Sequence, residues 1–279
     1  MKTIAIATCD GQPNLTPSDA SITALLEKES VMVHAVPWTK PINWQDFAMV
    51  LIRSPWDYHL RYQEFLAWLS ALEKNGVTVW NTPDTIRWNS DKSYLTSLPK
   101  IIPVVPTILV DNAQNIPESS PWEHIVVKPS VGASSHGIKH FTGSDTKTWR
   151  LYVTRLLQER AVLLQQYLPQ IEQGEYSFMF FDKKFSHAVI KTPARGDFRV
   201  QPEFGGTVKA VFPALPMVQS VQKILDIFPD SLLYARVDGL LIDNVFTLME
   251  IELCEPELFL DIDHSAPKRF VEAILRRLS

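Results

Sequence analysis

Short apolar runs alternate with amphipathic segments at the start of the chain. The apolar runs of strand length are residues 3–9, 31–36, 47–53 and 77–80. The segments with apolar residues at helical spacing are 17–28 and 62–75. Strands that alternate with helices predict a small parallel α/β domain over residues 1–87, and such a sheet binds ligands beyond the carboxyl ends of its strands.

The rhythm changes after this domain. We expect helices at residues 91–98, 144–159 and 268–278. We expect strands at residues 107–110, 125–128, 163–167, 176–181, 185–190, 232–242 and 246–253. This order predicts two α+β units, over residues 88–168 and 169–279.

Composition restricts the class of protein. The chain has 279 residues, 46% of them hydrophobic, which is enough for a sizeable core. A net charge of −4 argues against a nucleic-acid partner, and no apolar run approaches the roughly 20 residues of a membrane span. The first ten residues do not resemble a secretion signal. With two cysteines, Cys9 and Cys254, which we expect to be reduced, these features predict a cytoplasmic protein.

A lysine at the end of an apolar strand precedes a flexible loop. Lys128 closes the run that starts at Ile125, and the loop after it contains Gly132, Ser134, Ser135 and Gly137. Backbone amides of such a loop can bind phosphate oxygens while the ammonium supplies charge. Taken alone, a loop of this kind is more often an ordinary surface turn. A second lysine, Lys92, opens the predicted helix at residue 91.

Charged residues alternate on two consecutive strands near the end of the chain. Arg236 and Asp238 share one face of the first strand, and Glu250 and Glu252 share one face of the second. Hard oxygen ligands at this density suit Mg²⁺ bridged to phosphates. The alternative is a solvated sheet face with alternating charges.

The faces coincide only in one register of this hairpin. A regular two-residue turn at Asp243–Asn244 would place Asp238 opposite Met249, on the wrong face. A three-residue loop through Val245, or a bulge, would place Asp238 opposite Glu250. We therefore predict an odd loop or a bulge.

In this order, these motifs resemble the ATP-grasp superfamily from about residue 88 to residue 260. The resemblance implies two α+β subdomains that clasp ATP, preceded by a pre-ATP-grasp α/β domain. It implies that Lys92 and Lys128 contact the ATP phosphates and that loop 132–137 covers them. The adenine edge would be read by Gln165, Gln166, Tyr167 and Leu168. Glu175 would hold the ribose, with Glu172 as a second candidate.

The resemblance also implies that Asp238, Glu250 and Glu252 hold two Mg²⁺ ions, with Mn²⁺ as an alternative metal. The usual motif of the family is Glu-x-Asn, so Glu252 is a departure that adds negative charge to the site. Metal binding survives this change because a carboxylate also ligates Mg²⁺.

Three further segments resemble substrate-side motifs. Segment 191–201, with Gly205 and Gly206, is similar to bacterial glutathione synthetases and ribosomal-protein glutamate ligases, which implies that Arg199 steadies the transferring phosphoryl group. Arg236 matches the arginine that stabilises the tetrahedral intermediate in D-alanine–D-alanine ligases. Segments 53–58, 88–92 and 196–199 together resemble the O-ureido-D-serine cyclo-ligase family. That resemblance implies a substrate pocket formed by Arg53, Ser54, Trp56, Asp57 and Tyr58, although loop packing would equally explain Trp56 and Tyr58.

The predicted function is an ATP- and Mg²⁺-dependent ligase that joins a carboxylate to an amine or another nucleophile through an acyl phosphate. Lys128, Arg199 and Arg236 are its expected catalytic residues, and a small amino-acid-like molecule is its expected substrate. Two alternatives stay open, a kinase on the same scaffold and a nucleotide-binding module without turnover. A homodimer is the default expectation for a soluble enzyme.

Overall fold

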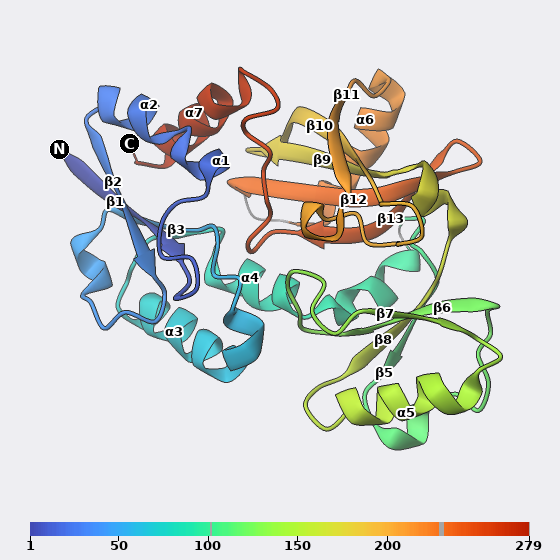
Figure 1. Ribbon diagram of the computed structural model, residues 1–279. Coiled ribbons are helices and arrows are strands. Elements are labelled where there is room, and N and C mark those ends of the chain that lie inside the picture. Colours follow the sequence, from blue (N-terminus) through green and yellow to red (C-terminus); the bar gives the residue numbers. More distant parts are fainter. Residues whose placement is uncertain (101, 229–231, 279) are drawn as a thin grey trace.

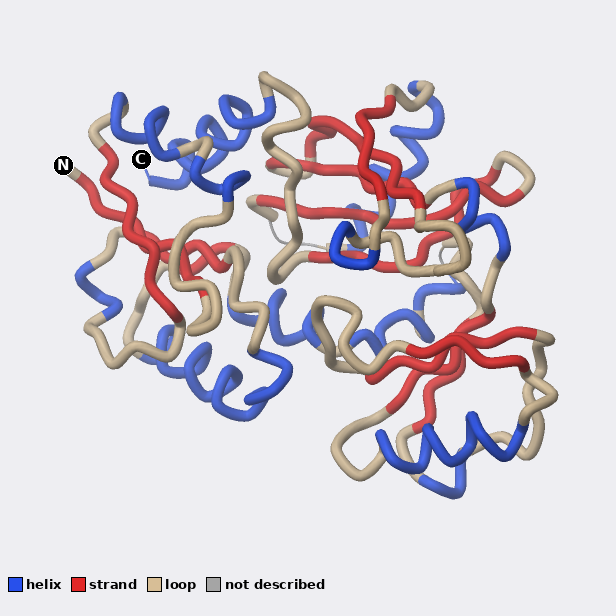
Figure 2. The backbone as a smooth tube through the Cα atoms, viewed as in Figure 1, coloured by secondary structure: helices blue, strands red, loops and turns tan. Residues whose placement is uncertain are grey.

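The structure is a computed structural model that describes residues 1–100, 102–228 and 232–278 (Figure 1). Three sheets form its framework, and Figure 2 shows them as separate groups of strands with helices packed around and between them. Within the described ranges, no helix is both long enough and apolar enough to span a membrane.

The first sheet is parallel, in the order β2-β1-β3-β4. Its strands are β1 (Lys2–Thr8), β2 (Val31–Pro37), β3 (Met49–Ile52) and β4 (Val79–Trp80). Ile4 and Ile6 pack into one core and Ala5 and Ala7 into another, so both faces of β1 are buried, as parallel sheets require. The helices of this part are α1 (Pro17–Ala20), α2 (Thr23–Lys28) and α3 (Tyr62–Lys74).

The predicted single helix over residues 17–28 is wrong, because it is broken between α1 and α2. The Ser21 hydroxyl donates to the Ser18 carbonyl at 2.6 Å, and such a local bond competes with continuation of the helix. At residues 91–98, where a helix was predicted, the structure has a 3-10 helix, η3 (Lys92–Thr96), and not an α-helix. It follows α4 (Pro83–Ser90). Helix α4 was not predicted, although the sequence contains the signals for its start, since Thr82 caps it and Pro83 occupies its first turn.

The second sheet is antiparallel, in the order β5-β8-β6-β7. Its strands are β5 (Thr107–Val110), β6 (His124–Pro129), β7 (Lys139–Thr142) and β8 (Val162–Gln166). Helix α5 (Thr146–Leu156) covers one face with Trp149 and Val153, which pack on Ile125 and Val127. Asp145 caps α5 by accepting from the Thr148 amide.

The third sheet is antiparallel, in the order β11-β10-β9-β12-β13. Its strands are β9 (Glu175–Phe181), β10 (Lys184–Thr192), β11 (Thr207–Val211), β12 (Tyr234–Ile242) and β13 (Val245–Glu252). Helices α6 (Leu215–Gln222) and α7 (Ala266–Leu278) accompany it. Phe270 and Ile274 of α7 share a core with Ile4, Leu26 and Phe181, so this helix joins the first and third sheets.

Buried Asn81 also ties the first sheet to the third. Its side-chain amide donates to the carbonyls of Tyr234 and Leu253 at 2.9 and 2.7 Å, and its oxygen accepts from the Leu233 amide at 2.8 Å. One side chain thus satisfies three buried backbone groups that lie about the ends of β12 and β13.

We predict that Asn81→Ala lowers the free energy of unfolding by about 3 kcal/mol or more, because each orphaned buried group costs about 1–3 kcal/mol. Urea denaturation of the two proteins measures the difference. Exposed Asn75, at the end of α3, offers the matched control Asn75→Ala, expected within about 0.5 kcal/mol of the parent. Equal losses in both variants would contradict the tie between the sheets.

Candidate active site

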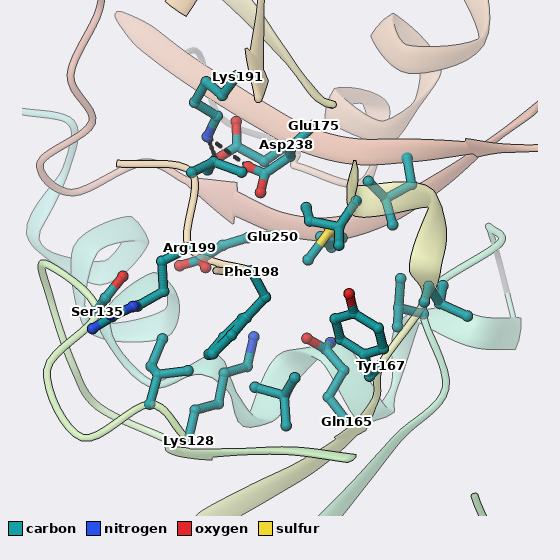
Figure 3. A pocket seen from close by; sticks show the side chains of 18 of the residues that line it. Lys128, Ser135, Gln165, Tyr167, Glu175, Lys191, Phe198, Arg199, Asp238 and Glu250 are labelled. Carbon is teal, nitrogen blue, oxygen red and sulfur yellow. Dashed lines mark hydrogen bonds and ion pairs between the residues drawn. The ribbon is translucent and has the colours of Figure 1, made fainter. Parts of the chain in front are cut away.

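A cavity of about 130 Å³ lies between the second and third sheets (Figure 3). Lys128 and Gln165 approach it from one side, while Glu175, Lys191 and Asp238 face them from the other. The predicted site residues that line it are Lys128, Ser135, Gln165, Gln166, Tyr167, Leu168, Glu175, Arg199, Arg236, Asp238, Glu250 and Glu252. Residues predicted separately for phosphate, adenine, ribose and metal therefore meet in one place.

A bulge sets the register of the β12–β13 hairpin. Ile242 pairs with Val245 across a two-residue turn, but the register shifts between Gly239 and Asp238, so that Asp238 pairs with Glu250. The predicted bulge is confirmed. Gly239 is needed there, since a Cβ would meet the Thr247 carbonyl oxygen at 2.5 Å.

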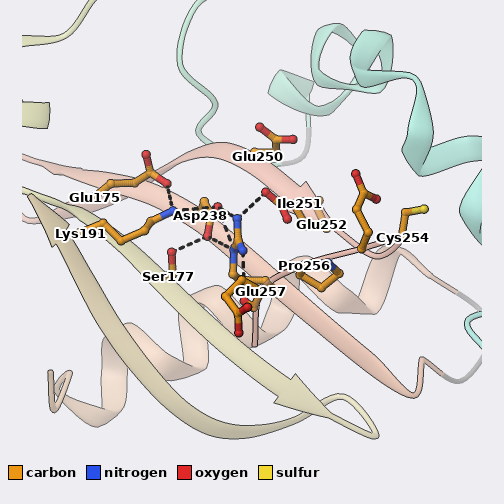
Figure 4. Close-up of polar contacts among 12 residues, drawn as sticks. Glu175, Ser177, Lys191, Asp238, Glu250, Ile251, Glu252, Cys254, Pro256 and Glu257 are labelled. Carbon is orange, nitrogen blue, oxygen red and sulfur yellow. Dashed lines mark hydrogen bonds and ion pairs between the residues drawn. The ribbon is translucent and has the colours of Figure 1, made fainter. Parts of the chain in front are cut away.

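Asp238 is the centre of a buried charge network (Figure 4). Arg236 donates from Nε and Nη2 to its two oxygens at 3.0 and 2.9 Å, and the Ser177 hydroxyl donates at 2.6 Å. Burial raises the pKa of Asp238, but the charges of Arg236 and Lys191 outweigh burial and hold this pKa well below its usual range. Asp238 is therefore a permanent carboxylate.

Lys191 is a site residue that the sequence prediction missed. Its ammonium lies 2.5 Å from Glu175 and 3.3 Å from Asp238, and its side chain is buried. A bulge between Phe185 and His187 brings Lys191 directly opposite Glu175. Without it, the Lys184–Phe181 register would pair Lys191 with Gly174 and turn it to the other face. No local sequence signal announces this bulge.

Glu252 and Glu250 contact cations from two directions. Arg236 Nη2 donates to Glu252, and Lys92 Nζ lies 3.2 Å from Glu250. Burial raises the pKa of Glu252 to about 8; the charge of Arg236 opposes this, and that of Glu250 adds to it. Burial lowers the pKa of Lys92, but Glu250 and its neighbours raise it more, so Lys92 stays charged.

The glycine-containing loop contacts Lys92 through its backbone. Lys92 Nζ donates to the Gly132 carbonyl at 2.6 Å, and Ser135 reaches the cavity. Ser134, Ser135 and Gly137 have positive φ, with Gly137 at 72°. Gly132, Ser134 and Gly137 do not line the cavity, so the loop meets it through Ser135.

The strand expected to read adenine runs along the cavity wall. Gln165 lies one residue before the end of β8 and donates to Thr107 Oγ1 at 3.0 Å. Tyr167 OH lies 3.5 Å from Glu172. Glu172 is exposed and does not line the cavity, whereas Glu175 does. Among the two ribose candidates, Glu175 has the better position.

Arg199 lies on the loop between β10 and β11. Its guanidinium makes two bonds to Asp197, at 3.1 and 2.7 Å, and these bonds hold the pKa of that carboxyl well below its usual range. Gly205 has φ 81°, and a Cβ on Gly206 would lie 2.2 Å from the Val200 carbonyl oxygen. The two glycines lie outside the cavity lining and permit the loop to fold back on itself.

The residues of the predicted substrate segment do not line this cavity. Arg53 is 1% exposed and bonds Asp19 at 2.9 Å and the Pro256 carbonyl at 2.8 Å. Ser54 and Tyr58 are buried as well, and Asp57 accepts from the Trp38 indole. Trp56 donates to the Glu255 carbonyl at 3.3 Å, which joins the segment to the chain just after β13. The substrate role of the five residues stays a prediction.

The carboxylates do not form a metal cage by themselves. In the described ranges, no group of three His, Cys, Asp or Glu side chains is placed to hold a metal ion. Mg²⁺ is commonly held by one or two carboxylates together with substrate phosphates. The donor set of Asp238, Glu250 and Glu252 fits a metal that shares its coordination with a nucleotide.

Two family models match the chain. The prokaryotic glutathione synthetase ATP-grasp domain matches residues 91–257, and the N-terminal domain of D-cycloserine synthetase DcsG matches residues 4–81. The cycloserine biosynthesis protein DcsG of Streptomyces lavendulae is 31% identical over 264 residues, which cover 85% of each protein. A glutathione synthetase of Nitrosomonas europaea is 29% identical over 60% of this chain and 52% of its own length.

Solved structures agree with these matches. The crystal structure of D-cycloserine synthetase DcsG aligns with a TM-score of 0.88 and 25% identity over 99% of this chain and 100% of that chain. D-alanine–D-alanine ligase from Bacillus anthracis, complexed with ATP, shares the fold with a TM-score of 0.70 and 14% identity over 100% of this chain and 97% of that one. The predicted ATP-grasp fold is confirmed, and this chain belongs to the ATP-grasp family of the prokaryotic glutathione synthetases and is an ATP-dependent ligase.

Proposed function

We propose that the chain activates the carboxylate of a small amino-acid-like substrate with ATP and Mg²⁺ and joins it to an amine through an acyl phosphate. The observation that carries this proposal is the composition of the cavity. Lys128, Lys191 and Arg199 supply positive charge, and Asp238, Glu250 and Glu252 supply oxygen ligands within the same space. Catalysis of phosphoryl transfer is mainly positioning and charge stabilisation, so these residue types suit it.

The substrate carboxylate oxygen would attack the γ-phosphorus, and the bond between that phosphorus and ADP would break. An amine would then attack the acyl carbon, the carbon–oxygen bond to phosphate would break, and the released phosphate would accept the amine proton. Bound Mg²⁺ would supply charge stabilisation for the polyphosphate. Lys128 and Arg199 would face the transferring group, and Arg236 would stabilise the oxyanion of the tetrahedral intermediate.

The remaining roles follow from position. We propose that Lys92 fixes the glycine-containing loop at Gly132 and supports Glu250. The adenine edge would be recognised by Gln165, Gln166, Tyr167 and Leu168. Glu175 would bind the ribose hydroxyls after Lys191 has turned away from it toward phosphate.

The likeness to a cycloserine-forming relative favours an amine carried by the same molecule as the carboxylate, so that the product is a ring.

We also propose that the chain has three structural units, at 1–87, 88–168 and 169–279, that it forms a homodimer and that it is located in the cytoplasm. The two cysteines are free and buried, which suits a reducing compartment.

Incubation with ATP, Mg²⁺, hydroxylamine and a panel of amino acids tests this proposal. An acyl phosphate reacts with hydroxylamine, so we expect an amino-acid-dependent hydroxamate together with ADP and phosphate. A stable phosphorylated product without hydroxamate would instead establish a kinase. Absence of ADP formation with every substrate would favour the module without turnover.

We predict that Lys128→Ala and Glu250→Gln each lower ATP turnover by about 10²–10³-fold, because each removes a charge next to the polyphosphate. A coupled assay for ADP measures the effect. The exposed residues Lys147 and Glu64 provide matched controls, Lys147→Ala and Glu64→Gln, expected to keep parental turnover. Activity retained in both site variants would refute the assignment.

Glu252 makes metal binding depend on pH. With a pKa of about 8, it is mostly protonated at neutral pH, and a bound metal must displace that proton. In the presence of a non-hydrolysable ATP analogue, apparent Mg²⁺ affinity should therefore rise from about pH 6 to about pH 8, by at most about tenfold per pH unit.

Calorimetric titration of Mg²⁺ at several pH values measures this slope. Glu252→Asn, which restores the usual Glu-x-Asn motif, should reduce it to the slope that the nucleotide itself contributes. An identical slope in the parent and in Glu252→Asn would exclude Glu252 as the titrating group.

A further inference from the structure

A second cavity, of about 100 Å³, lies on another side of the glycine-containing loop. None of its lining residues lines the first cavity. Its walls come from three parts of the chain. These are the 3-10 helix η2 (Tyr58–Arg61), the end of β6 with the loop that follows it, and the end of α5 with the turn that leads to β8. The polar side chains in its lining are His59, His136, Glu159 and Arg160.

His59 is buried with little hydrogen bonding. It is 6% exposed, and neither of its ring nitrogens makes a hydrogen bond of full geometry among the described residues, although the Trp56 backbone interacts with the ring. Native structures rarely leave a buried ring with both nitrogens unsatisfied, because each costs the desolvation of a polar atom. A ligand in the cavity that His59 lines would satisfy them.

Arg160 supplies positive charge to the lining of this cavity. The His136 ring lies 5.0 Å from the His59 ring, and the Arg160 side chain is only 22% exposed. Arg160 Nη1 donates to the Val131 carbonyl at 2.9 Å. Glu159 lies 3.8 Å from Arg160, but its side chain is 75% exposed, so its charge is in solvent.

The pKa of His59 reports the same environment. Burial lowers it, and the charge of His136 lowers it further to about 4, although the Trp56 backbone acts in the opposite sense. At neutral pH His59 is therefore an uncharged ring with one N–H donor. The end of α5 does not offset the positive charge, because the Leu156 carbonyl accepts from the amides of Glu159 and Arg160.

We propose that this cavity is a binding site for a small oxyanion such as inorganic phosphate. His59, His136 and Arg160 would donate to its oxygens, and the apolar walls at Val131 and Leu156 would exclude larger ligands. Its volume is several times the space that one water molecule requires. The three donors come from separate parts of the chain, so the bound ion holds the glycine-containing loop against η2 and the turn after α5.

The test uses the full chain labelled with ¹⁵N-histidine and titrated with phosphate at neutral pH and constant ionic strength. Signals of His59 and His136 are assigned with His59→Phe and His136→Gln. We expect both rings to shift with one saturable curve, while the exposed His264 stays unchanged. Sulfate should reproduce this curve, because the proposed site takes small oxyanions, and a curve with acetate would support the same site with carboxylates among its ligands.

Phosphate could also bind in the first cavity. Repeating the titration on Lys128→Ala distinguishes the two sites, because the His59 curve should persist in this variant. Arg160→Gln should weaken binding about tenfold or more, and Arg160→Lys should recover part of it. If Arg160→Gln does not fold, His136→Gln should still weaken the His59 curve several-fold. Absence of saturable shifts, which means a cavity that holds only water, or unchanged affinity in the folded variants would overturn the proposal.

Discussion

The burial of Asp238 as a permanent carboxylate is the constraint on which the site depends. A buried charge is costly unless it is paired. Arg236 on the same strand, β12, and Lys191 on β10 pair with Asp238, and Ser177 on the intervening strand β9 adds a hydrogen bond. Lys191 extends the network to Glu175. The third sheet thus holds carboxylates and cations close together, and these are groups with which a nucleotide and its metal would exchange partners.

Two bulges make this arrangement possible. Side chains alternate along a strand, so a one-residue shift moves a whole set to the other face. One bulge turns Glu250 toward Asp238, and the other turns Lys191 toward Glu175. The third sheet therefore presents charge on its cavity side and apolar residues such as Phe178 and Val237 to its core. The strand register that places apolar residues in the core therefore also places the charged residues in the site.

Much of this could be predicted from the sequence, but not the register everywhere. The β12–β13 hairpin is short, and its four charged residues can form a metal site only if they share a face. The bulge could therefore be inferred. In the β9–β10 hairpin, Lys191 follows an apolar run, and no charged residue next to it indicates on which face of the sheet it lies. A continuous helix was expected at 17–28, because hydrophobic spacing does not reveal that the Ser21 hydroxyl bonds the Ser18 carbonyl. The contacts of Arg53 with Asp19 and Pro256 depend on tertiary structure that no local pattern encodes.

The central claim is that one cleft binds ATP together with a metal that the carboxylates alone do not hold. Calorimetric titration with ADP, in the presence and absence of Mg²⁺, tests it most directly and requires no knowledge of the other substrate. We expect one nucleotide per chain, tighter binding with Mg²⁺, weak binding of Mg²⁺ alone, and loss of the Mg²⁺ effect in Asp238→Asn. Tight binding of Mg²⁺ without nucleotide, or nucleotide binding indifferent to Mg²⁺, would contradict it.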